Sequence, residues 1–173
     1  GMSPTPLFKS LQIAFAENPS MRDKTDILLM GKMNKPEIIA SASKHGVNDV
    51  VQVLGAHPHE DAVRLMQSCH ILLLFTGMVY KSASGKIFEY AASGRPVLSF
   101  GIQQFTRNFI EENKFGYSVN GNNPREGAEQ LKSLFKIWSE GGNILGSLPE
   151  QYEKYSRPKL TQKLARLLDE VTK

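Results

Sequence analysis

Apolar residues along the chain alternate between short aliphatic runs and longer segments in which they recur every three or four positions. Short runs of this kind are typical of buried strands, and the longer spacing is typical of helices. The pattern predicts four clear strands and a weaker fifth, at residues 26–30, 50–54, 70–75, 96–100 and 116–119. Three of the runs are almost wholly apolar, which is expected of strands that helices cover on both faces.

The segments between these runs carry helical spacing. They predict helices at residues 6–18, 35–45, 59–68, 85–93, 105–113 and 124–140, a segment after Pro149 and a last helix at 161–170. Strands that alternate with helices in this way indicate an α/β fold, a Rossmann-like three-layer α/β/α sandwich around a mostly parallel sheet.

The chain divides into three parts. Residues 1–2 are typical of a tag-cleavage scar with the start of the protein. We expect residues 3–140 to form the Rossmann-like domain and residues 141–173 to form a helical extension packing on the same domain. The extension follows a pair of glycines, and its last helix carries a stripe that we expect to pack back on the core. The stripe consists of Leu160, Leu164, Leu167, Leu168 and Val171.

The predicted order opens with a helix. In a parallel sheet a helix normally crosses over from a preceding strand, so this order indicates that an upstream strand is missing. The alternative is a helix added to the amino end of a complete domain.

Composition narrows the class of protein. With 173 residues, of which 40% are hydrophobic and 22% charged, the chain suits one soluble globular domain. The longest apolar run, at 71–75, is far shorter than the roughly 20 residues that span a bilayer. The chain has one cysteine, Cys69, and no recognisable secretion signal, which favours the cytoplasm.

The net charge of +4 suits an anionic ligand such as a nucleotide diphosphate, or an acidic membrane surface. Lysine and arginine are spread along the whole chain rather than clustered, which argues against a nucleic-acid partner.

Ligands of open parallel sheets bind beyond the carboxyl ends of the strands. The loop at 76–86 is the richest there, because small residues leave backbone N–H groups free at the start of a helix, where Lys86 adds a cation. Glu89 follows one turn later and suits a vicinal diol such as a ribose. A structural alternative is a capping box, in which a serine and the acid only satisfy the helix end.

Other common sites are absent from the sequence. Residues 84–86 lack the pattern of a Walker A loop, and no G-x-G-x-x-G follows a strand, which argues against an NTPase or a simple dinucleotide dehydrogenase. His57 and His59 have no acidic or cysteine ligands nearby, so we expect no metal site there.

The segment from Gly85 to Leu98, GKIFEYAASGRPVL, resembles the donor-binding segment of GT-B glycosyltransferases of the retaining group 1 type, which includes glycogen synthase and many bacterial polysaccharide enzymes. Residues 51–55, 59–72 and 111–119 resemble the flanking units. The likeness extends over about residues 3–140, the C-terminal, nucleotide-sugar-binding half of a GT-B fold.

The resemblance implies roles for matching positions. Glu89 matches the second of two glutamates spaced eight apart, which binds the ribose hydroxyls. Ser84, Gly85, Lys86 and Ile87 match the helix start whose backbone holds the diphosphate.

Gly55 and His57 match the loop beside the nucleobase. Lys81 stands where the first glutamate belongs, so contacts to the donor sugar depart from the family pattern there. The family's diphosphate-gripping arginine and lysine fall upstream of residue 1. Catalytic residues remain unknown.

The resemblance implies an enzyme that moves a sugar from a nucleotide-sugar to a glycan, lipid or other hydroxyl acceptor, with no cofactor and no required metal. Its partners are the nucleotide-sugar and an N-terminal acceptor-binding domain, without which we expect this chain to be inactive. The parent enzyme is expected in a bacterial cytoplasm, also at the inner face of the membrane, in polysaccharide biosynthesis. The alternatives are a sugar-nucleotide 2-epimerase-like half and a noncatalytic nucleotide-binding or protein-interaction module.

Overall fold

The structure, a computed structural model, describes residues 3–76 and 85–171. Its strands are β1 (Ile27–Met30), β2 (Val51–Gly55), β3 (Leu72–Thr76), β4 (Val97–Gly101) and β5 (Gly116–Asn120). Its helices are α1 (Thr5–Glu17), the 3-10 helix η1 (Pro19–Lys24), α2 (Lys35–Lys44), α3 (His59–Ser68), α4 (Lys86–Ala92), α5 (Gln104–Glu112), α6 (Pro124–Ser139), α7 (Pro149–Glu153) and α8 (Arg157–Val171). The predicted alternation of strands and helices is therefore confirmed.

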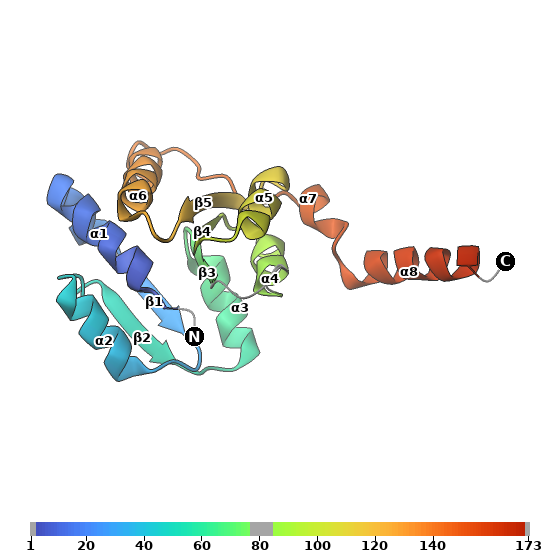
Figure 1. The fold of residues 1–173 in the computed structure, drawn as a ribbon, viewed down its shortest axis with the longest axis horizontal. Coiled ribbons are helices and arrows are strands. Elements are labelled where there is room, and N and C mark those ends of the chain that lie inside the picture. The colour runs from blue at the N-terminus through green and yellow to red at the C-terminus, as the bar shows by residue number, and fades with distance from the viewer. Residues whose placement is uncertain (1–2, 77–84, 172–173) are drawn as a thin grey trace.

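All strand pairs of the described chain are parallel, as predicted, but they form two sheets rather than one (Figure 1). β1 pairs with β2, with Ile27 opposite Val51. β3, β4 and β5 form the second sheet, in that order. No hydrogen-bonded ladder joins β1 to β3. The sheet is thus interrupted next to the helix that opens the chain.

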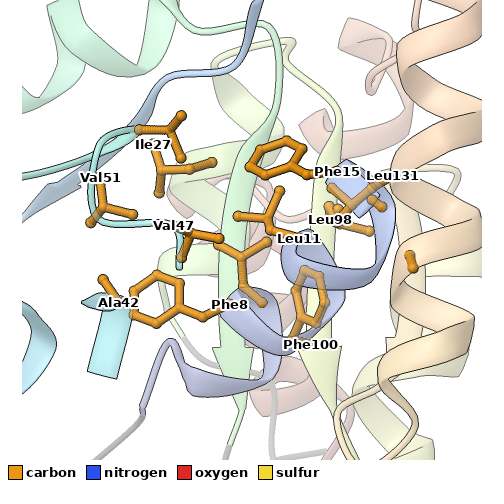
Figure 2. Close-up of a cluster of buried hydrophobic side chains, with 14 of the residues drawn as sticks. Phe8, Leu11, Phe15, Ile27, Ala42, Val47, Val51, Leu98, Phe100 and Leu131 are labelled. Atoms are coloured by element: carbon orange, nitrogen blue, oxygen red, sulfur yellow. The ribbon is translucent and has the colours of Figure 1, made fainter. Parts of the chain in front are cut away.

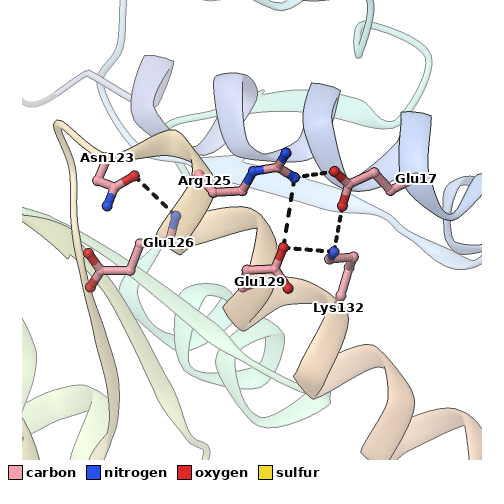
Figure 3. Close-up of polar contacts among 6 residues, drawn as sticks. All are labelled: Glu17, Asn123, Arg125, Glu126, Glu129 and Lys132. Carbon is pink, nitrogen blue, oxygen red and sulfur yellow. Dashed lines mark hydrogen bonds and ion pairs between the residues drawn. The ribbon is translucent and has the colours of Figure 1, made fainter.

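Two of the helices have an asparagine at the cap position and a proline in the first turn, Pro36 in α2 and Pro124 in α6. Asn34 accepts a hydrogen bond from the Glu37 N–H at the start of α2. Asn123 does the same for Glu126 at the start of α6 (Figure 3). The asparagine satisfies a backbone donor that the helix leaves free, so these sequence signals fix where α2 and α6 begin.

Two apolar clusters lie on opposite faces of β4. Leu98 and Phe100 belong to a cluster with α1, α2 and α6 (Figure 2). Val97, one position away, belongs to the other cluster, with Ile87 of α4 and Ile110 of α5. Because successive strand side chains point to opposite faces, this division confirms the three-layer α/β/α sandwich.

α1 and α6 pack side by side although they come from opposite ends of the domain (Figure 1). Gly127 permits this close approach, because a Cβ atom there would lie 2.2 Å from the Ser10 Oγ. At the end of α1, the Glu17 carboxylate binds Arg125 and Lys132 of α6 (Figure 3). The two helices are therefore joined by both apolar packing and charge.

The extension after residue 140 behaves in two ways. Ser147 is buried and donates a hydrogen bond to the Ala91 carbonyl, and the Tyr155 hydroxyl donates to Asn113 Oδ1 at 2.7 Å. This part packs on the domain. α8 does not, because none of its residues is buried and it projects away from the body of the molecule (Figure 1).

The prediction that the leucine stripe of α8 packs back on the core is therefore wrong. All five residues of the stripe are exposed: Leu160, Leu164, Leu167, Leu168 and Val171. The two apolar clusters are already covered by α1 and α6 on one face and by α4, α5 and α7 on the other.

Candidate functional site

Parallel strands bring the loops after β1 and β2 together at one edge. The Gly31 N–H donates a hydrogen bond of 2.7 Å to the Gly55 carbonyl. Both glycines have positive φ angles, 130° and 79°. A Cβ atom at Gly55 would meet open space, so it is the left-handed backbone and not crowding that favours glycine there. The turn places the next residues at the carboxyl edge.

His57 is held by the loop that carries it. Its Nε2 lies 3.1 Å from the Leu54 carbonyl oxygen. A carbonyl only accepts hydrogen bonds, so Nε2 carries the hydrogen, and Nδ1 of the neutral ring is left as an acceptor. The side chain is exposed. A ligand at this edge therefore finds an oriented imidazole.

The first turn of α4 presents two charged side chains to solvent. Gly85 precedes the helix, and Lys86 and Glu89 are both exposed. Ile87 between them is fully buried in the apolar cluster, which anchors the turn. Among the residues that the structure describes, none forms a hydrogen bond or ion pair with the Lys86 or Glu89 side chain.

The capping alternative for Glu89 finds no support at this helix end. Gly85 occupies the cap position and has no side chain to form a cap. A capping box places its acid at the third helical position, whereas Glu89 is the fourth residue of α4. Ser84 and Lys81, which belong to the same predicted site, lie outside the described residues.

A cleft of about 1090 Å³ brings part of the predicted site together. His57, Lys86 and Glu89 all line it. Gly55 and Gly85 shape the adjoining turns without lining the cleft, and the Ile87 side chain points into the core. For Ile87 only the backbone remains available to a ligand.

Lys32 also lines this cleft, and sequence reasoning did not single it out. It follows Gly31 directly after β1 and is exposed. The available signal was a glycine and a lysine immediately behind a strand, at the edge where ligands bind. Lys32 and Lys86 thus supply cations from two separate loops.

Two further groups of the cleft are poor nucleophiles or acids at neutral pH. Burial raises the pKa of the Cys69 thiol. Burial also raises the pKa of Tyr90, and the neighbouring Glu89 charge adds to this effect. Both groups therefore remain protonated, and the chemistry of the cleft rests on its exposed charges. Across residues 3–76 and 85–171, no three His, Cys, Asp or Glu side chains are grouped as metal ligands.

The fold is similar to solved glycosyltransferase structures. A glycosyltransferase from Rickettsia africae matches 100% of this chain and 45% of its own, with 16% sequence identity and a TM-score of 0.75. Anabaena Alr3699/HepE, solved with UDP and glucose, matches 94% of this chain and 44% of its own, with 15% identity and a TM-score of 0.69. Sucrose-phosphate synthase from Thermosynechococcus elongatus has 15% identity and a TM-score of 0.69, over 95% of this chain and 42% of its own.

These similarities confirm the predicted fold, and the chain spans less than half the length of these three proteins. Among curated proteins, no sequence matches this chain. In the described part of the chain, no helix combines the length and apolarity that crossing a membrane requires. The sequence profile of the glycosyl transferases group 1 family matches residues 5–136, most of the domain. This chain therefore belongs to the glycosyl transferases group 1 family.

Proposed function

We propose that this chain is the donor-binding domain of a glycosyltransferase that moves a sugar from a nucleotide-sugar to a glycan, lipid or other hydroxyl acceptor. Family membership supports the reaction class. The observation that carries the proposal is local: Lys86 and Glu89 have no described partner, and both line the same cleft as His57. Charged side chains that lack a protein partner at the carboxyl end of a strand are available to bind the polar groups of a ligand.

The diphosphate of the donor binds at the start of α4 in this proposal. The backbone N–H groups of residues 84–87 donate to phosphate oxygens, and Lys86 neutralises charge. Lys32 approaches from the loop after β1 as a second cation. Glu89 accepts hydrogen bonds from the two ribose hydroxyls, with both of its oxygens.

The nucleobase lies beside Gly55 and His57, where Nδ1 is available as an acceptor. Lys81, which lies outside the described residues, occupies the sequence position of the family's first glutamate, so this proposal includes a different contact to the donor sugar there. We propose uridine as the first base to test. Anabaena Alr3699/HepE was solved with UDP and glucose, and the pneumococcal O-GlcNAc transferase GtfA with UDP and GlcNAc.

The chemical contribution of this domain is to stabilise the leaving group. Negative charge grows on the diphosphate as the bond to the sugar breaks, and preorganised cations and N–H groups bind that charge more strongly as it develops. We expect no metal requirement, as the family resemblance implies. We also expect the isolated chain to bind donor without transferring sugar.

The acceptor belongs to a second domain of a longer polypeptide. This part of the proposal is supported by the share of length that the chain covers, 44% of Alr3699/HepE and 45% of the Rickettsia protein. We propose a bacterial cytoplasmic enzyme of polysaccharide biosynthesis that also works at the inner face of the membrane. The exposed leucines of α8, among basic residues such as Lys163 and Arg166, suit an acidic lipid surface.

Calorimetric titration with UDP, GDP and ADP tests the donor site. We expect millimolar or tighter binding of one diphosphate, and a loss of roughly tenfold or more in Lys86→Ala and Glu89→Gln, since hydrogen bonds to charged groups contribute about 1.5–3 kcal/mol. Lys44→Ala and Glu112→Gln are matched controls, because both residues are exposed and lie outside the cleft.

Thermal unfolding of the same variants separates binding from folding. Glu89→Gln should leave the melting temperature of the free chain unchanged, because Glu89 makes no described contact that stabilises the fold. Unchanged affinity together with a lowered melting temperature would instead make Glu89 a structural residue. Absence of binding to all three diphosphates would reject the donor site.

A further inference from the structure

α4 depends on its surroundings for its position. The helix spans only seven residues, Lys86–Ala92. Isolated helices of this length are unstable in water, so packing decides where α4 lies. Its sides have different surroundings: Lys86 and Glu89 line the cleft, whereas Ile87 and Ala91 are fully buried in the apolar cluster beneath the helix.

A segment that follows α6 packs against α4. Ser147 is buried, and its hydroxyl donates a hydrogen bond of 2.5 Å to the Ala91 carbonyl in the last turn of α4. A Cβ atom at Gly146 would lie 2.3 Å from the Gly94 carbonyl oxygen, so the segment also runs against the turn that follows the helix. α7 contacts α4 as well. We call residues 146–155 the α4 clamp.

Tyr155 is the last residue of the α4 clamp and packs against the side of α4. Its ring contacts three others, with centroid distances of 5.4 Å to Phe88, 5.3 Å to Phe109 and 6.1 Å to Phe115. The Tyr155 hydroxyl donates to Asn113 Oδ1, and the Asn113 side-chain amide donates to the Phe109 carbonyl at 2.8 Å. Tyr155 is therefore fixed to α5 and holds the Phe88 ring of α4 in place.

Phe88 links the α4 clamp to the cleft because Glu89 is the next residue of α4. Successive side chains of a helix point about 100° apart, so a rotation of α4 that displaces the Phe88 ring moves the Glu89 carboxylate through the same angle. Side chains that bind a ligand together need placement within about 0.5 Å. The contact between Tyr155 and Phe88 can therefore set the position of Glu89 in the cleft.

The α4 clamp itself does not reach the cleft. None of its residues is among those that line the cleft. It also lies beyond residues 5–136, the part of the chain that the family profile matches. Any effect of the clamp on a bound ligand must therefore pass through α4.

We propose that Tyr155 is a positioning residue for the binding of a nucleoside diphosphate and that it acts on Glu89 through Phe88. This inference rests on the proposed function, in which Glu89 binds the ribose of the donor. Its physical basis is preorganisation, because the apparent affinity falls in proportion to the fraction of molecules whose site is correctly arranged. If loss of the Tyr155 ring reduces that fraction to about one fifth, binding weakens roughly fivefold.

Titration of the 173-residue chain with UDP, followed by NMR well below the melting temperature, gives the first test. We expect Tyr155→Ala to weaken binding at least roughly fivefold. Tyr155→Phe keeps the ring and should bind UDP within roughly twofold of the unchanged chain, although it loses the hydrogen bond to Asn113. Rescue by phenylalanine would identify the ring contact with Phe88 as the cause. Equal UDP affinity of Tyr155→Ala and the unchanged chain would overturn the proposal.

Gly127→Ala is the control that separates positioning from general stability. Gly127 lies against Ser10 and Phe100 in the contact between α1 and α6, and Phe100 belongs to the apolar cluster on the opposite face of β4 from Phe88. This variant should destabilise the domain and leave the affinity for UDP unchanged. If Gly127→Ala weakens UDP binding as much as Tyr155→Ala does, affinity follows overall stability and the proposal is wrong.

A double-mutant cycle tests the path through Glu89. Tyr155→Ala should weaken UDP binding at least roughly fivefold in the unchanged chain but less than roughly twofold in the Glu89→Gln background. The effect shrinks there because the carboxylate that Tyr155 positions has already been removed. Additive effects of the two substitutions on UDP affinity would show that Tyr155 does not act on Glu89, and would overturn the proposal.

Hydrogen exchange of the free chain distinguishes failure of this proposal from failure of the donor site. The Ser93 N–H donates to the Glu89 carbonyl at 3.2 Å, at the end of α4, and the Val47 N–H donates to the Ala42 carbonyl in the other apolar cluster. Tyr155→Ala should accelerate exchange at Ser93 at least roughly tenfold more than at Val47. If this occurs and UDP, GDP and ADP all fail to bind, the donor site is rejected while the clamp still positions α4. Equal acceleration at both amides would overturn the role of the clamp.

Discussion

The Glu17 carboxylate and the Lys132 ammonium lie 2.5 Å apart, joining the last turn of α1 to the middle of α6 (Figure 3). Arg125 binds the other carboxylate oxygen. Hydrogen bonds from Lys132 and then from Arg125 lower the pKa of Glu17 from its ordinary value of 4.5. This network is the charged part of the contact between the two helices.

Glu17→Gln should lower the melting temperature at neutral pH and have less effect in acid. A carboxyl whose pKa is lower in the folded chain stabilises the fold above the unfolded value of 4.5, and that contribution disappears as the pH falls through the folded pKa. Melting curves from neutral pH to below 4.5 measure the effect, with Glu112→Gln as the control. High salt should reduce the difference, because these groups are partly exposed. A constant difference at all pH values would contradict the assignment.

Gly127→Ala should destabilise the domain, although alanine favours helices by about 1 kcal/mol over glycine. The new methyl group would lie 2.2 Å from the Ser10 Oγ and 3.0 Å from the Phe100 ring. Overpacking of this kind costs about 1–3 kcal/mol. Denaturant unfolding measures the loss, and Ser10→Ala in the same chain should restore part of it. An increase in stability from Gly127→Ala alone would show that α1 and α6 are not in close contact.

Tyr155→Phe should lower the free energy of unfolding by about 1–2 kcal/mol. The hydroxyl donates to Asn113 Oδ1 at 2.7 Å, and Asn113 is only 8% exposed, so the variant leaves a buried acceptor without its partner. Tyr152→Phe is the control, because no hydrogen bond of its hydroxyl is present in the described part of the chain. If the two variants have the same free energy of unfolding, the hydrogen bond from Tyr155 to Asn113 does not stabilise the fold.

Removal of α8 should leave the melting temperature unchanged. A chain ending at Ser156 loses no buried residue, whereas one ending at Leu148 also loses Tyr152 and Tyr155 and should melt lower. The chain without α8 should also bind less to vesicles of acidic lipid, because it lacks the exposed leucines of that helix. A lower melting temperature for the chain ending at Ser156 would mean that α8 docks on the domain in solution.

Lys32→Ala should weaken nucleoside diphosphate binding by roughly tenfold at low salt, because it removes a charge-assisted contact to phosphate. Lys24→Ala is the matched control. Lys24 lines the same cleft but precedes β1, whereas Lys32 follows it. Calorimetry at two salt concentrations measures both. An equal effect of the two variants would indicate general attraction of anions rather than a site at the carboxyl edge.

The sequence pattern predicted the layers well because β4 is buried along almost its whole length and the helices that cover its two faces have apolar sides. The pattern predicted one sheet, whereas the described strands form two, because strand runs show which segments are extended and not which of them pair. The pattern was wrong for α8, because periodicity identifies an apolar face and not what covers it. The stripe from Leu160 to Val171 is as regular as that of a packed helix, yet it is exposed.

For the site, spacing placed Lys86 and Glu89 on one turn, and the structure adds that His57 lines the same cleft. Lys32 was missed because a glycine and a lysine behind a strand are a weak signal by themselves, and its place at the cleft follows only from how the strands pair. The sequence also could not show that the Ile87 side chain is unavailable to a ligand, because its burial depends on the packing of the folded chain. Ser84 and Lys81 stay predictions.

The pairing of α1 with α6 also sets an order of events during synthesis. Glu17 and Arg125 are 108 positions apart, so α1 leaves the ribosome roughly ten seconds before its partner helix exists. Phe8 and Leu11, which are fully buried in the finished domain, have no α6 to shield them during that interval. Nascent chains of this protein are therefore expected to engage chaperones through their first helix until α6 has emerged.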